Sequence, residues 1–98
     1  MAQFIAAVRR NYDAFPESQF TVELLEQEAE AARRLYADGV FRQMWGRQDS
    51  PGAVMLIEAA SLEAAREAVD SLPLRRNGML LLDGLIGLSP YRGFGPRG

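Results

Sequence analysis

The order in which strand-like and helix-like segments follow one another constrains the fold of this chain more than any other feature. Four segments are dense in apolar residues and predict β-strands over residues 4–8, 40–48, 53–57 and 79–88. Two segments carry an apolar stripe at the helical repeat and predict helices over residues 22–38 and 61–72. The sequence therefore predicts the order strand, helix, strand, strand, helix, strand.

Residues at the ends of these segments agree with this assignment. Thr21 and Ser61 stand where the two helices begin, and their side chains are good N-caps. Gly39 is the expected stop of the first helix, and residues 49–52 are a strong turn signal between two strands. Residues 9–20 are interpreted as a loop. The predicted fold class is α+β and ferredoxin-like, a four-stranded antiparallel sheet with two helices on one face.

The length and the apolar strands predict one domain that associates with its own copy. A chain of 98 residues suits a single domain over residues 1–98. Both helices have one apolar stripe and should cover the same face of the sheet, yet residues 4–8 and 53–57 are apolar on both faces. A second subunit packing sheet to sheet would cover the other face. The alternative is a poorly covered sheet shielded by the C-terminal tail.

The tail, residues 89–98, is rich in glycine and proline and carries Tyr91 and Phe94. Aromatic residues among glycines cannot form a core of their own. We therefore expect the tail to contact a neighbouring subunit of a homodimer or a higher ring-like oligomer.

Composition excludes several classes of function. The chain has no cysteine and no histidine, which excludes disulfides, Cys/His zinc sites and a histidine general base, and its acidic residues show no metal-ligand spacing. A net charge of −2 argues against a general nucleic-acid binder or a polybasic membrane anchor. No apolar run approaches the ~20 residues that span a bilayer, and Arg9 and Arg10 follow the first apolar segment, the wrong order for a signal peptide. A soluble cytoplasmic protein is expected.

Glu28 is the most informative side chain. It falls near the middle of the apolar face of the first predicted helix, among Leu24, Leu25, Ala31, Ala32 and Leu35. A carboxylate in that place is costly unless it is paired, and burial without a full partner would raise its pKa and suit a general acid or base. A structural ion pair with Arg42 or Arg47 is an equal alternative.

The segment 42–47 places two arginines, an amide and an indole on one predicted strand, as Arg42, Gln43, Trp45 and Arg47. Arginine can hold a carboxylate through two hydrogen bonds and tryptophan offers a flat apolar wall, so the set would suit a small organic acid. Alternatively, Trp45 belongs to the core or an interface and the arginines are solvated.

Three further polar residues remain open to two interpretations. Asp83 interrupts the apolar run of the last strand just before Gly84, and it is either at a strand bulge or in a site. Tyr12 and Tyr91 lie in predicted loops, where each could donate a phenolic proton or be a surface residue.

Taken together, the spacings resemble a known family. Glu28-x-Glu30-x-Ala32-x-Arg34-Leu35-x3-Gly39-x2-Arg42-x2-Trp45 is similar to the first helix and second strand of muconolactone Δ-isomerase. Three further pieces resemble its second helix and last strand: Ser61-x-Glu63-Ala64, Leu72-Pro73-Leu74 and Asp83-Gly84-Leu85. Gln43 stands where the family pattern has a histidine.

The resemblance implies a ferredoxin-like, dimeric α/β-barrel protein and a cofactor-free isomerase of aromatic compound catabolism. Such an enzyme moves a double bond within a small lactone or enol acid by proton transfer. By this resemblance, Glu28 would be the catalytic residue, and Arg42 and Trp45 would shape the pocket. From the chemistry of the residues themselves, we add Arg47, Gln43, Tyr12 and Asp83 as predicted substrate contacts. The wider group also implies two alternatives. One is a cofactor-free monooxygenase or cyclase on an aromatic polyketide, with Tyr12, Trp45 and Met55 as pocket walls, and the other is a non-catalytic oligomeric binding protein.

Overall fold

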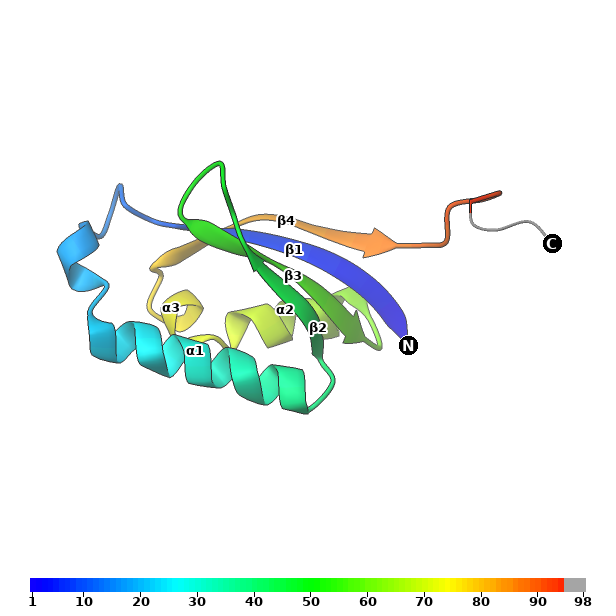
Figure 1. Ribbon diagram of the computed structural model, residues 1–98, viewed down its shortest axis with the longest axis horizontal. Helices are drawn as coiled ribbons and strands as arrows, with labels where there is room; N and C mark the ends of the chain where they lie inside the picture. The colour runs from blue at the N-terminus through cyan, green and yellow to red at the C-terminus, as the bar shows by residue number, and fades with distance from the viewer. Residues whose placement is uncertain (95–98) are drawn as a thin grey trace.

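The computed structural model describes residues 1–94 and contains one sheet with helices on one side of it (Figure 1). Its elements are β1 (Ala2–Arg10), the 3-10 helix η1 (Glu17–Gln19), α1 (Val22–Ala37), β2 (Phe41–Gly46), β3 (Gly52–Ala59), α2 (Leu62–Asp70), α3 (Pro73–Arg76) and β4 (Leu80–Leu88). The predicted alternation of strands and helices is confirmed. Figure 1 also shows residues 89–94, which follow β4, running away from the sheet.

The four strands form an antiparallel sheet in the order β2-β3-β1-β4. The central strand β1 pairs with β3 on one side, where Ala6 lies opposite Met55, and with β4 on the other, where Ala6 lies opposite Leu85. This is the predicted α+β, ferredoxin-like fold. Since β2 and β4 are the edges, α1 connects β1 to an edge strand by crossing over β3.

The two long helices begin where their N-caps predict. The Thr21 hydroxyl accepts a hydrogen bond from the Leu24 N–H at 3.2 Å, and the Ser61 hydroxyl accepts one from the Ala64 N–H at 3.1 Å. Gly39 has a φ of 77° just past α1, the left-handed conformation that ends helices. These two hydrogen bonds and the conformation of Gly39 define both ends of α1 and the start of α2.

Two parts of the predicted secondary structure were wrong. The first strand continues through Arg9 and Arg10 instead of ending at Val8, and the predicted loop contains η1. The second helix ends at Asp70, and Pro73 begins a separate one-turn helix, α3. A proline disfavours helical backbone in the residue before it and suits the first helical position, which explains why Pro73 interrupts one helix and opens another.

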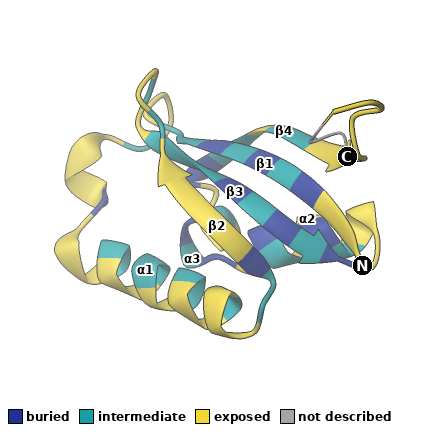
Figure 2. Cartoon of the chain, turned by 45° about the vertical axis from the view of Figure 1, so that its right-hand side comes forward, coloured by how far each residue is buried: buried dark blue, intermediate teal, exposed yellow. Residues whose placement is uncertain are grey.

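The core lies between the sheet and the helices. Along β1 and β3, fully and partly buried residues alternate, as the dark blue and teal bands of Figure 2 show. The largest fully buried side chains are Phe41, Met55, Ile57, Leu72, Val8 and Val69. α1 has no fully buried residue, so its inner face meets the sheet less closely than α2 does. Leu62, the first residue of α2, is half-exposed.

The other face of the sheet is apolar and open. Ile5 lies between Leu56 of β3 and Ile86 of β4 on this face, since its neighbours Phe4 and Ala6 point into the core. Ile86 is 60% exposed, and none of the described helices covers this face. The prediction that both faces of the central strands are apolar is therefore confirmed. Within residues 1–94, no helix has the length and apolar character needed to cross a membrane.

Candidate functional site

Glu28 connects α1 to α3. Its Oε1 accepts a hydrogen bond from the main-chain N–H of Leu74 at 3.0 Å. Leu74 is in the first turn of α3, where an amide N–H has no partner within its own helix. The carboxylate therefore supplies the acceptor that α3 lacks, and it is held in one orientation by that bond.

The second carboxylate oxygen of Glu28 has no protein partner among the described residues. Glu28 makes no ion pair there, and Oε2 accepts no hydrogen bond from the chain. Burial raises the pKa of Glu28 because it disfavours the charged form, and the hydrogen bond from Leu74 opposes this shift only in part. The alternative of an ion pair with Arg42 or Arg47 was wrong.

A cavity of about 150 Å³ lies next to this carboxylate. It lies between α1, α3 and the helix-covered face of the sheet, is partly open to solvent, and is lined by Val8, Arg10, Leu25, Glu28, Met44, Gly52, Ala53, Leu72, Leu74 and Leu80. Glu28 and Arg10 are the two charged groups in an otherwise apolar lining. Such a cavity suits a small organic molecule with few polar groups rather than a drug-sized ligand.

Arg10, which the sequence interpretation did not single out, is the second charged group of this cavity. Its guanidinium lies over the ring of Phe20, with Cζ 5.0 Å from the ring centroid, and its Nη1 donates a hydrogen bond to the Tyr12 hydroxyl at 3.0 Å. Tyr12 in turn packs edge-on against Phe20 at 5.3 Å between centroids. Arg10 has no carboxylate partner among the described residues.

Two of the predicted substrate-binding residues, Gln43 and Trp45, lie on the opposite face of the sheet from Glu28. Gln43 and Trp45 pair with Leu56 and Val54, which belong to the open face. Met44, between them, pairs with the buried Met55 and lines the Glu28 cavity. Trp45 therefore does not line the Glu28 cavity. The Gln43 side chain accepts a hydrogen bond from the Met44 N–H, and Met55 is a core residue rather than an exposed wall.

Arg47 and Asp83 meet in a charge network on the open face. Arg47 Nη1 donates to Asp83 at 2.6 Å, its Nη2 donates to Asp49 at 2.6 Å, and Arg9 binds Asp83 at 2.8 Å. The Arg47 guanidinium lowers the pKa of Asp49 to about 2 and, with Arg9, holds the pKa of Asp83 below its usual range. Asp83 is the extra residue where the β1–β4 register shifts, so the interpretation as a bulge is confirmed.

The remaining predicted residues are dispersed. Arg42 pairs with Glu58 at 3.5 Å and does not line the Glu28 cavity. Tyr91 is 82% exposed on the tail. Tyr12 is the one predicted substrate-binding residue near the cavity, which it approaches through Arg10.

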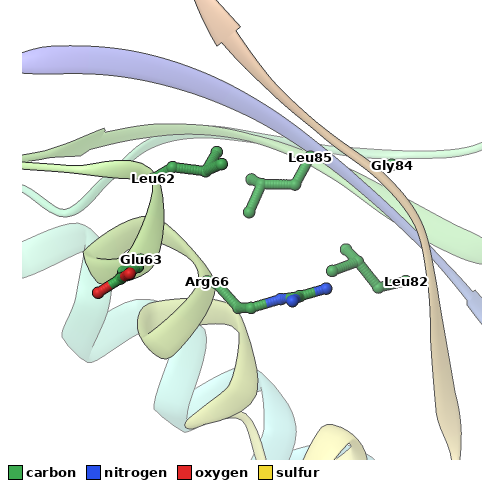
Figure 3. Close-up of a pocket in the computed structure, with 6 residues that line it drawn as sticks. All are labelled: Leu62, Glu63, Arg66, Leu82, Gly84 and Leu85. Atoms are coloured by element: carbon green, nitrogen blue, oxygen red, sulfur yellow. The ribbon is translucent and has the colours of Figure 1, made fainter.

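A second pocket, of about 280 Å³, lies between α2 and β4 (Figure 3). It is lined by Leu62, Glu63, Arg66, Leu82, Gly84 and Leu85. Arg66 extends toward Leu82, whereas Glu63 points away from both (Figure 3). Because its polar groups do not converge, this pocket offers no acid–base or anion-binding arrangement comparable to the first. Residues 1–94 also contain no group of acidic side chains placed to hold a metal ion.

Comparison with known proteins supports the fold alone. No protein-family model matches the sequence, and the curated proteins give no significant match. Among solved structures, the chain is similar to the crystal structure of muconolactone isomerase, with a TM-score of 0.76 and 19% sequence identity, over 98% of this chain and 97% of that one. The likeness spans both whole chains, so it shows that the two share the ferredoxin-like fold.

Proposed function

We propose that this protein is a muconolactone isomerase-like enzyme that moves a double bond within a small lactone or enol acid, with Glu28 transferring the proton. The observation that supports this most is the unpartnered Oε2 of Glu28 beside an apolar cavity. The shared fold with muconolactone isomerase agrees with the proposal. A second feature in its favour is the raised pKa of Glu28, because a carboxyl group with a raised pKa is a stronger base.

The proposed step needs one proton carrier. Oε2 of Glu28 removes a proton from a carbon conjugated to the lactone carbonyl, and the electron pair of that C–H bond delocalises to the carbonyl oxygen. The same carboxyl group then returns the proton to another carbon of the conjugated system, which leaves the double bond in its new position. Atoms and charge balance, and Glu28 ends as it began. The Leu74 N–H keeps the carboxylate in one orientation throughout.

Turnover of muconolactone in D₂O tests the proposal. If Glu28 exchanges its proton with solvent between the two transfers, the isomerised lactone carries deuterium at the carbon that was protonated, which NMR detects. Formation of that product with the wild-type protein supports the proposal. Absence of both isomerisation and exchange, in protein shown by NMR to be folded, would contradict it for this substrate class.

We further propose that the open face of the sheet packs on the same face of a second copy. The supporting observations are the exposed apolar side chains of this face, among them Trp45, Ile86 and Leu88, beside the charge network of Arg47 and Asp83. A two-fold arrangement would place equal apolar patches against each other. The predicted contact of the tail with a neighbouring subunit stays a prediction: Tyr91 and Phe94 are 82% and 86% exposed, and residues 95–98 lie outside the described part.

A further inference from the structure

We infer that Arg10 is the anion-binding group of the Glu28 cavity and holds a carboxylate of the ligand while Glu28 faces the ligand's carbon frame. The inference rests on the proposed function for its substrate and deepens it by naming a residue and a ligand class. The class is a small, otherwise apolar monocarboxylate. Three observations about Arg10 carry the argument.

The first observation is that the guanidinium of Arg10 has no acidic partner among the described residues. Eight ion pairs are found among the described residues, and Arg10 is in none of them. The one hydrogen bond of its guanidinium goes to the Tyr12 hydroxyl and not to a carboxylate. The guanidinium has five N–H donors in a planar fork, so most of them have no protein acceptor. An arginine in this state is suited to bind a carboxylate through two parallel hydrogen bonds.

The second observation is that the surroundings fix the guanidinium in place. One face of it lies on the buried ring of Phe20, and the Tyr12 hydroxyl takes one donor. Both contacts reduce the side-chain freedom that the guanidinium would lose on binding. Since neither contact neutralises its charge, both prepare Arg10 for an external anion.

The third observation is the position of Arg10 relative to Glu28. Arg10 follows Val8 at the spacing of two that keeps side chains on one face of a strand, and both residues line the cavity. Glu28 reaches the same cavity from α1, yet the two charges are not within the 4.0 Å of an ion pair. A ligand can therefore lie between them. Its carboxylate would meet Arg10, and its carbon frame would meet the apolar walls and Oε2 of Glu28.

A competing role for Arg10 is stabilisation of the negative carbonyl oxygen that develops during the reaction. The two roles differ in ground-state binding. An anchor for a carboxylate makes the protein prefer an acid over its ester before any reaction occurs, whereas a group that acts on the developing oxyanion makes no such distinction.

The test uses two ligands without a double bond to move: a saturated γ-lactone with a carboxymethyl group, and its methyl ester. Binding of each is measured by NMR titration of the full chain. We expect the wild type to bind the acid about tenfold to a hundredfold more tightly than the ester, the range for a charge-assisted hydrogen-bonded pair. Arg10→Gln should abolish the preference by weakening binding of the acid alone. Arg66→Gln, which removes one exposed arginine from the other pocket, should retain it.

Two further variants separate anchoring from folding. Arg10→Lys keeps the charge and should retain part of the preference, and Tyr12→Phe keeps the ring against Phe20 but removes the acceptor for Arg10 and should weaken binding of the acid more than of the ester. The inference is overturned if the wild type binds neither ligand or both equally, or if Arg10→Gln and Tyr12→Phe keep the full preference. Because neither ligand can isomerise, these outcomes do not depend on whether the protein turns over muconolactone.

Discussion

The carboxylate of Glu28 accepts the main-chain N–H of Leu74 at 3.0 Å and thereby joins α1 to the first turn of α3. The bond uses one oxygen for structure and leaves the other beside the cavity. A structural role and the proposed chemical role therefore fall on one side chain, and the two can be separated because they depend differently on charge. A neutral amide can still accept the Leu74 N–H, but it cannot remove a proton from carbon.

The first prediction concerns pH and the Glu28→Gln variant. Burial raises the pKa of Glu28 in the folded protein above its unfolded value, so the folded state holds the proton to higher pH than the unfolded state does. Its contribution to stability is therefore fully present at acid pH and is lost as the pH rises through the raised pKa. Urea unfolding of wild type and variant across this range measures it. As pH rises, the free energy of unfolding of Glu28→Gln should increase relative to that of the wild type.

Glu26→Gln, on the exposed face of the same helix, controls for the loss of one negative charge. If the wild type instead gained stability relative to Glu28→Gln as pH rises, folding would lower the pKa of Glu28. That result would contradict the partial burial of this carboxylate without an ionic partner.

Gly52 provides the second prediction, because β3 and β1 approach closely at this residue. A Cβ built on Gly52 would overlap the Val8 carbonyl oxygen and lie 2.8 Å from the Arg9 Cα, whereas a Cβ on Gly46 would meet nothing within 4 Å. Gly52→Ala should lower the free energy of unfolding by about 1–3 kcal/mol, as overpacking does. Gly46→Ala should change it by no more than about 0.5 kcal/mol. Equal effects of the two changes on urea unfolding would argue against the β1–β3 pairing at the cavity.

The third prediction tests the second copy. A charged residue at Ile86, in the middle of the open face, should prevent sheet-to-sheet packing because an ammonium group would have to be buried there without a partner. Light scattering should give a smaller mass for Ile86→Lys than for the wild type. Leu62→Lys is the matched control, since Leu62 is 51% exposed on the helix side of the sheet. A monomeric wild type, or an unchanged mass for Ile86→Lys, would exclude this interface.

The tail gives the fourth prediction. Tyr91 and Phe94 are 82% and 86% exposed and are not part of the core formed by residues 1–94. Removing residues 90–98 should therefore reduce the number of subunits in the oligomer, because contacts with a neighbouring subunit are lost. Light scattering gives this number as the particle mass divided by the mass of one chain. Because β4 ends at Leu88, the truncation leaves the sheet intact. The same number of subunits with and without the tail would refute a role of the tail in assembly.

Most of the fold could be predicted because local signals and long-range requirements agree. Thr21 and Gly39 mark the ends of α1 through side-chain and backbone chemistry that acts within a few residues. The helix α3 could not be predicted in the same way. It is a single turn, too short to show a helical repeat, and its opening residue Pro73 also signals the end of a helix.

The candidate site was predictable only in part, and the reason lies in β2. A register shift in the β2–β3 pairing places Phe41 and Met44, three residues apart, on the core face, opposite Ile57 and Met55. A regular strand would have kept Phe41 and Trp45 on one face. This one irregularity places Gln43 and Trp45 on the open face instead of the core face of Phe41, and the hydrophobic pattern does not reveal it.

Glu28 and its neighbours illustrate the same limit. Its place on the inner face of α1 follows from the helical repeat, but its partner is an amide 46 residues later, and only the tertiary structure brings them together. The position of Arg10 beside the cavity could have been predicted from the sequence. Phe4, Ala6 and Val8 are buried at intervals of two, and extending that strand by two residues would have placed Arg10 beside them.

The central claim, that Glu28 transfers the proton, is tested most directly by the rate of muconolactone isomerisation in Glu28→Gln and wild type. The amide fits the same space and can accept the Leu74 N–H, so the variant should fold and bind the lactone with little change. The account predicts that kcat falls about 10²–10⁴-fold, the usual loss when a general acid–base is removed. A Glu28→Gln protein that isomerises the lactone at the wild-type rate would contradict it.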